Sequence, residues 1–268
     1  LGTMAAGEAL TFSEAALSLL SEANREESEL DLRMVAHEAA YRADDPGAMS
    51  RHFAWIYASR DLVRVNEARQ LWISKAYAGS TFSGAIRIGW RVLEALGSLP
   101  AWEKREEVYK EAERFVRTLK PKAVERELLA RPMTTDPLTR LRIRTASRLV
   151  LPVLTVAHEH LALLVYTVIR ASLQNGRTGY TGIAYVAWAL LSAIERGAGK
   201  HLAALSNSAS LLAEKGGDPV ARHSIDTYAR IFTLTWIDGY DKGMGELQTL
   251  YEEGNRLGNY QFASHCKH

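Results

Sequence analysis

The stretch "KAYAGSTFSGAIRIGWRVLEALGSLP", from Lys75 to Pro100, decides the fold because an earlier stretch follows the same pattern. From Ala39 to Arg60 the chain reads "AAYRADDPGAMSRHFAWIYASR". Each stretch has Ala-Tyr, then a short polar loop, and then a small or flexible apolar residue eight positions after the tyrosine. Tyr41 and Tyr77 are 36 positions apart, close to the period of ~34 residues that is typical of helical-hairpin repeats. The sequence therefore predicts one helical hairpin that is used twice.

This repeat fixes the expected register of both hairpins. Tyr41 and Tyr77 belong near the ends of the two first helices. Met49 and Ala85 belong near the starts of the two second helices, packed against the helix before them. A small or flexible apolar residue at these positions allows the two helices of a hairpin to cross closely.

The rest of the chain also has helical periodicity, in segments of the usual helix length that mostly end at glycine. "RIFTLTWI", residues 230–237, is rich in strand-forming residues, but no partner strand is evident nearby, so we expect a helix there. Thr11 or Ser13 is the expected N-cap of the first helix. Thr135 or Asp136 is the expected cap of a long helix that begins near Pro137.

Composition limits the class of protein. The chain has 268 residues, of which 47% are hydrophobic and 24% are charged, and this is enough to build a buried core. A net charge of +2 gives no general attraction to nucleic acid or to an acidic membrane. The single cysteine, Cys266, allows no intramolecular disulfide and weakly favours a reducing cytoplasmic location. The longest apolar runs are shorter than the ~20 residues that a membrane span needs.

No enzymatic motif emerges. "ERGAGKH", Glu195–His201, lacks the first glycine and the Ser or Thr of a phosphate-binding loop, so we interpret it as a turn between helices. His158 and His160 are separated by about 200° around a helix and are poorly placed to share a metal. Gly-x-Ser-x-Gly is absent. The sequence therefore predicts no enzyme, no cofactor and no metal site.

Two groups of basic residues are candidate partner-binding sites. Arg140, Arg144 and Arg148 recur every four residues and form one positive stripe on the predicted helix. The stripe is either a solvated helix face or a surface for an acidic protein. Nucleic acid is a weaker alternative, because the interleaved aromatic residues of a single-strand binder are absent.

The second group comes from the hairpin register, which places one set of first-helix side chains along a groove. These positions are Val35, Ala39 and Arg42 in the first hairpin, and Leu71, Lys75 and Ala78 in the second. Arg42 and Lys75 are the charged members, so we expect the groove to favour an acidic segment or one that carries a C-terminal carboxylate. Alternatively, both side chains merely extend over apolar neighbours.

The tryptophans also have two interpretations. Each lies inside or at the edge of a predicted helix, at a spacing that favours inter-helix core over a ligand-binding platform. They are Trp55, Trp72, Trp90, Trp102, Trp188 and Trp236.

Three features of the chain together resemble the tetratricopeptide-like region of large bacterial and fungal signalling proteins, over roughly Leu30 to Ala263. They are the hairpins, the segment "RPMTTDPLTRLRIRTASRL" and the segment "YTGIAYVAWALLSAIERGAGKHLAALSNSASLL". The resemblance rests on Met-Thr-x-Asp-Pro around Asp136, Ala-Tyr-x-Ala-Trp-Ala-Leu around Trp188, and the late Trp236. In those proteins the region follows an AAA/STAND-type ATPase, often behind a serine/threonine kinase domain. GAF and histidine-kinase modules often come after it.

The resemblance implies an all-α fold, a right-handed solenoid of degenerate tetratricopeptide-like hairpins. Residues 1–268 would form one elongated repeat domain, as a fragment of a larger multidomain protein. The function expected first is a non-catalytic scaffold that binds another protein or another domain of its own chain. The alternative is a sensor of a small-molecule effector, with an apolar pocket between the central and C-terminal helices that is lined by Trp188 or Tyr185 and a few polar groups.

Overall fold

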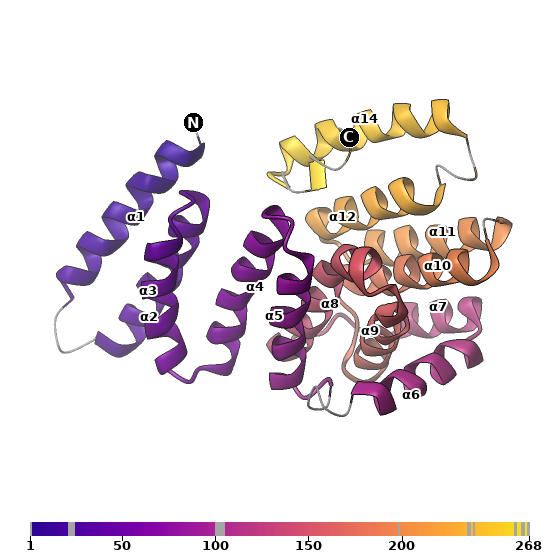
Figure 1. Ribbon diagram of the computed structural model, residues 1–268, viewed down its shortest axis with the longest axis horizontal. Helices are drawn as coiled ribbons and strands as arrows, with labels where there is room; N and C mark the ends of the chain where they lie inside the picture. The colour runs from indigo at the N-terminus through magenta and orange to yellow at the C-terminus, as the bar shows by residue number, and fades with distance from the viewer. Residues whose placement is uncertain are drawn as a thin grey trace. The chain divides into compact units, whose positions relative to one another are not determined.

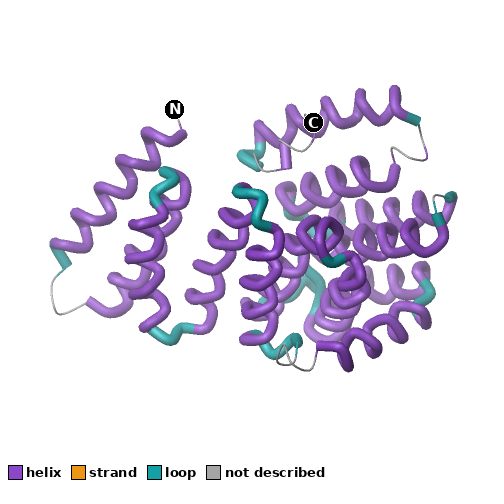
Figure 2. Tube along the Cα trace, viewed as in Figure 1, coloured by secondary structure: helices purple, strands orange, loops and turns teal. Residues whose placement is uncertain are grey.

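Every regular element in the described part of the chain is helical (Figure 2). The computed structural model describes residues 2–20, 25–99, 105–197, 199–234, 237, 239–259, 262, 263 and 266. Within these residues there is no named strand, and the one β-type contact is an isolated parallel bridge between Met133 and Arg177. The all-α prediction is therefore confirmed.

The chain divides into two compact units, Leu1–Ile88 and Gly89–His268, with the boundary inside α5. The helices up to that boundary are α1 (Gly2–Ser18), α2 (Arg25–Arg42), α3 (Pro46–Ala58), α4 (Leu62–Ala78) and α5 (Phe82–Ala95). The α-helices after it are α6 (Arg105–Thr118), α7 (Pro121–Ala130), α8 (Pro137–Val156), α9 (Leu161–Asn175), α10 (Ile183–Arg196), α11 (Lys200–Glu214), α12 (Pro219–Ala229) and α14 (Tyr240–Arg256). Three short elements complete the second unit: η3 (His158–His160), η4 (Gly179–Gly182) and the π-helical η5 (Arg230–Leu234).

The two predicted hairpins have the same turn, atom for atom, 36 residues apart. After α2, the Asp45 amide donates to the Ala40 carbonyl at 2.9 Å, and after α4 the Thr81 amide donates to the Ala76 carbonyl at 2.8 Å. The residue before each donor has a positive φ, 57° at Asp44 and 55° at Ser80. This is the six-residue hydrogen-bonded closure that commonly ends a helix, although glycine usually holds the positive-φ position. The repeat of this turn, with Tyr41 and Tyr77 near the ends of α2 and α4, is confirmed.

Small residues lie where the two helices of each hairpin meet. Met49 and Ala85 are both fully buried, as the register predicts. In the first hairpin, Met49 joins a buried cluster with Ala40 and Ala48. In the second, a Cβ added to Gly84 would lie 3.9 Å from the Cβ of Ala76, so this crossing is also close.

Three helices begin with the same Asp-Pro pair. Asp45, Asp136 and Asp218 are the N-caps of α3, α8 and α12, and a proline follows each of them. Each aspartate side chain accepts backbone N–H groups that the first helical turn leaves unpaired. Proline is suited to the next position because its fixed φ is helical and its missing N–H is not needed there. Asp136 is thus the cap predicted for the helix that begins at Pro137.

The expectation that Thr11 or Ser13 caps the first helix is wrong. α1 begins at Gly2, so Thr11 and Ser13 lie inside it rather than at its start. Their hydroxyl groups donate to the carbonyls of Gly7 and Ala9, four residues back, instead of capping. Residues 230–234 are helical as predicted, but in the wider π form.

The core of Gly89–His268 is built on α9 and α10. Residues 161–169 of α9 and residues 183–190 of α10 are buried on every side, which explains why both segments are apolar almost throughout. The helices from α8 to α12 pack in chain order, each against the next one (Figure 1). α10 also contacts α8 and α12. α6 packs against α9, and α7 packs against α11, so the second unit also joins helices far apart in the sequence.

Candidate functional site

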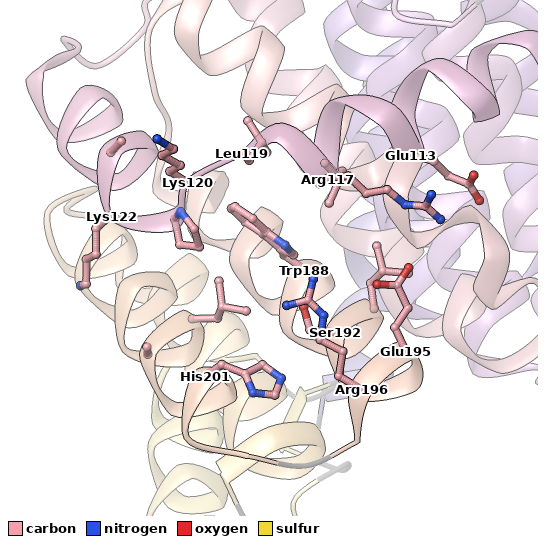
Figure 3. Close-up of a pocket in the computed structure, with 16 residues that line it drawn as sticks. Glu113, Arg117, Leu119, Lys120, Lys122, Trp188, Ser192, Glu195, Arg196 and His201 are labelled. Carbon is pink, nitrogen blue, oxygen red and sulfur yellow. The ribbon is translucent and has the colours of Figure 1, made fainter.

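A pocket of about 580 Å³ lies within the second unit, between the α6–α7 connection, the C-terminal half of α10 and the start of α11 (Figure 3). Its volume is within the range of small-molecule sites. The apolar lining comes from Val116, Leu119, Pro121, Trp188, Leu191 and Leu205. The ionisable lining comes from Glu113, Arg117, Lys120, Lys122, Glu195, Arg196 and His201.

The floor of the pocket is held by buried aromatic residues of α10. Trp188 is only 7% exposed, and its ring centroid lies 5.7 Å from that of the fully buried Tyr185. The Tyr185 hydroxyl donates to the Pro121 carbonyl at 2.8 Å, which fixes the start of α7 against α10. Burial raises the pKa of Tyr185, so the hydroxyl keeps the proton that this hydrogen bond needs.

A second contact fixes α7 against α11. Glu125 accepts hydrogen bonds from Ser208 on α11 and from Lys122 on its own helix, the latter at 2.9 Å. Burial of Glu125 opposes its ionisation, but the hydrogen bonds from Ser208 and Lys122 outweigh that cost and lower its pKa. Glu125 is therefore ionised and holds α7 against α11. Its carboxylate also neutralises the charge of Lys122.

Three cations of the pocket are not matched in this way. Arg117, Lys120 and Arg196 make no hydrogen bond or ion pair with another side chain in the described ranges. Figure 3 shows Arg196 and His201 directed into the pocket from α10 and α11, and Lys122 directed away from its centre. The arrangement offers an apolar surface for one part of a ligand and free positive charge for another.

The two basic residues predicted in the first unit are engaged in ion pairs. Arg42 Nη2 lies 2.5 Å from Glu38 Oε1, and Lys75 Nζ lies 2.5 Å from Asp44 Oδ1. Arg42 and Lys75 thus have different ion-pair partners, one on α2 and one in the turn after it. The expectation for Ala39 is wrong: it is 5% exposed, so it belongs to the core and cannot face a partner in a groove.

The predicted stripe on α8 is partly used by the fold. The Arg140 guanidinium donates to the Thr134 carbonyl at 2.9 and 3.1 Å, so it fastens the turn before its own helix. Arg144 is exposed, and Arg148 is half-buried. Burial raises the pKa of Tyr180, and the nearby charges of Arg144 and Arg148 oppose that rise. Arg144 and Arg148, the last two residues of the stripe, therefore lie near Tyr180.

Four of the predicted core tryptophans can be placed. Trp90 and Trp188 are buried, whereas Trp55 and Trp72 are half-buried. Trp102 and Trp236 lie outside the described residues. Trp188 belongs to the core and to the pocket floor at once, so the two interpretations of this residue are compatible. Sequence reasoning had no signal for Arg117 or Arg196, because each looks like an ordinary charge at the end of a helix.

The described residues show no candidate metal site and no candidate membrane span. Within the described part of the chain, no three His, Cys, Asp or Glu side chains gather in a way that could hold a metal ion. None of the helices there has both the length and the apolar character that crossing a bilayer requires. Comparisons with protein-family models, with curated proteins and with solved structures found no match.

Proposed function

We propose that this chain is a non-catalytic regulatory domain and that the pocket around Trp188 binds its effector. The observation that carries the proposal is the combination of a buried aromatic floor with three cations that have no partner among the described residues. Small-molecule sites characteristically join an apolar lining to a few well-placed polar groups. Unpaired basic side chains around such a lining select ligands with an acidic group.

The effector is therefore a small amphipathic anion, with an apolar or aromatic body and one acidic group. Its body would lie against Trp188 and Leu191, and its acidic group would lie near Arg117 or Arg196. Glu113 and Glu195 also line the pocket, so a ligand with several negative charges is disfavoured by repulsion.

Replacement of either free arginine should weaken the binding of an amphipathic carboxylate. We expect Arg117→Gln and Arg196→Gln each to reduce octanoate affinity about 10-fold, because a hydrogen bond to a charged group is typically worth about 1.5–3 kcal/mol. Isothermal titration calorimetry with octanoate, and with octanol as the neutral counterpart, measures the effect.

Arg126→Gln is the matched control, because Arg126 is an exposed arginine on α7 that does not line the pocket. It should leave octanoate affinity unchanged. Equal binding of octanoate by the wild-type protein and both pocket variants would show that the pocket does not select an acidic group.

A second candidate function is supported by the hairpin repeat. The matching turns at Asp44 and Ser80 are what a tetratricopeptide-like right-handed solenoid would use. We infer from the resemblance that such a solenoid would act as a cytoplasmic scaffold in a signalling ATPase or kinase. Its partner would be a protein with an acidic segment rather than nucleic acid. The residues proposed to bind it are Arg42 and Lys75 in the first unit, and the alternative is the stripe of Arg140, Arg144 and Arg148 in the second unit.

Charge reversal tests the scaffold. We expect Arg42→Glu with Lys75→Glu to weaken binding of a synthetic oligoglutamate peptide, more strongly at low salt because surface charges are screened at high salt. Glu38→Gln with Asp44→Asn is the control: it breaks the same ion pairs but leaves both cations, so binding should be kept or increased. Fluorescence anisotropy of the labelled peptide is the measurement. If the variant with both charges reversed binds the peptide as well as wild type does, Arg42 and Lys75 are not the binding residues. The stripe on α8 would then be the proposed site.

A further inference from the structure

A second, smaller pocket lies in the same unit, where the end of α5 meets α8 and α9. Its volume is about 200 Å³. Thr167, Arg170 and Gln174 line it from one face of α9, since these positions follow a helical spacing of three and four residues. Ser98 and Arg142 line it from the end of α5 and from α8. The Arg142 guanidinium donates to the Leu96 carbonyl at 2.6 Å, which joins α8 to the end of α5.

Three hydrogen-bonding atoms of this lining have no partner among the residues that the structure describes. Ser98 Oγ, Thr167 Oγ1 and Arg142 Nε are shielded from solvent and make no hydrogen bond with any of those residues. A buried hydroxyl on a helix usually donates to the carbonyl four residues back, as Thr145 does to Leu141 at 2.7 Å. Buried polar atoms without a partner are uncommon and cost folding free energy, and a bound ion or water is a usual explanation.

The lining is also rich in donors and poor in acceptors. Arg142 and Arg170 each supply a guanidinium, Gln174 supplies an amide, and none of the described lining residues is Asp or Glu. Two carboxylates lie nearby. Glu111 accepts a hydrogen bond from Tyr166 at 2.6 Å and lies 3.5 Å from Arg170, while the charge of Asp136 acts on Arg142. Each carboxylate matches part of one guanidinium charge and leaves the hydroxyl groups unpaired.

We propose that this pocket binds a phosphate group, either inorganic phosphate or that of a small phosphate monoester. Phosphate oxygens accept several hydrogen bonds at once, and arginine suits them because its planar fork donates in pairs. Side chains that turn slightly toward the pocket would give Ser98, Thr167 and Arg142 the acceptor that they lack. The site is distinct from the Trp188 pocket, and its proposal does not depend on the effector proposal.

An unpaired hydroxyl should lower thermal stability when the pocket is empty and should strengthen binding when phosphate is present, and the test measures both effects. Thr167→Val removes the hydroxyl at nearly constant shape. In chloride buffer this variant should melt at the same temperature as wild type or higher, because a buried atom without a partner is removed. In phosphate of matched ionic strength, wild type should gain thermal stability, and Thr167→Val should bind phosphate about 10-fold more weakly. Ser98→Ala should act in the same direction.

Thr145→Val is the matched control, because Thr145 is equally buried but its hydroxyl has a partner. It should lower the melting temperature and leave phosphate affinity unchanged. Glycerol phosphate distinguishes the source: tighter binding than inorganic phosphate indicates a monoester, and weaker binding indicates the free ion. No thermal shift of wild type in phosphate, or an equal shift in acetate, would overturn the proposal, and a buried water would then be the partner of these groups.

Discussion

Replacing Gly182 with alanine is expected to destabilise the second unit by about 3 kcal/mol, at the upper end of overpacking costs. A Cβ at this position would lie 2.3 Å from the carbonyl oxygen of Ala209, which belongs to the backbone of α11. A side chain could rotate away, but a backbone carbonyl within a helix cannot. Gly182 has an ordinary helical φ of −58°, so glycine is needed here for close approach rather than for conformation.

Chemical denaturation of the full chain measures this effect. Gly245→Ala is the control, because a Cβ at Gly245 in α14 would meet nothing within 4 Å. Alanine should stabilise that helix by up to about 1 kcal/mol through its higher helix propensity. If Gly182→Ala unfolds like wild type, the end of η4 does not approach the backbone of α11 as closely as the structure shows.

The first unit is expected to lose stability on mild acidification. His37 is fully buried, and its two ring nitrogens lie 3.0 Å from the Met49 carbonyl and 3.2 Å from the Ala68 carbonyl. Burial lowers the pKa of His37 below its ordinary value of 6.5, although both carbonyls favour the charged ring. Burial, and then the charge of Arg33, also lower the pKa of His52.

The direction of the pH effect follows from these lowered pKa values. At a pH between the two pKa values of such a histidine, the unfolded chain binds more protons than the folded one. Stability is therefore fully present above pH 6.5 and is lost as the pH falls through 6.5 toward the folded-state pKa. The loss is at most about 1.4 kcal/mol per pH unit for each histidine.

Denaturation at about pH 7.5 and about pH 5.5 measures this loss. His37→Gln should reduce the difference between the two conditions, because it removes one of the two responsible groups. His158→Gln is the control, since His158 is exposed, and it should leave the difference unchanged. A wild-type chain that is equally stable at both pH values would contradict the buried, neutral state of His37.

The helical hairpins could be predicted from sequence because their signals are local. The Ala-Tyr pairs, the small or flexible residues eight positions later and the Asp136-Pro137 helix start all act within a few residues of themselves. Thr11 and Ser13 show the limit of local signals. Both are good cap residues, but the alanine-rich segment before them favours helix, and their hydroxyl groups then bond back to that helix instead.

The two pockets could not be predicted in detail because they depend on tertiary contacts. The alternative sensor function expected Trp188 or Tyr185 in a pocket, but Arg117 and Arg196 come together only because α6 and α10 line the same space. The small pocket is distinguished by the hydroxyl groups of Ser98 and Thr167, which have no partner among the described residues. Whether a hydroxyl has a partner depends on its neighbours in space, and no pattern along the chain reports that.

The anchors of the Trp188 pocket have a consequence for the order in which the chain folds. Tyr185 reaches back 64 residues to Pro121, and Ser208 reaches back 83 residues to Glu125. The hairpins of the first unit close over short loops and can form as soon as their own residues leave the ribosome. Contacts between distant residues form later, because closing a long loop costs more entropy before any contact stabilises it. The pocket is therefore completed only after α11 has been synthesised, so nascent chains that end before Ser208 should bind no effector.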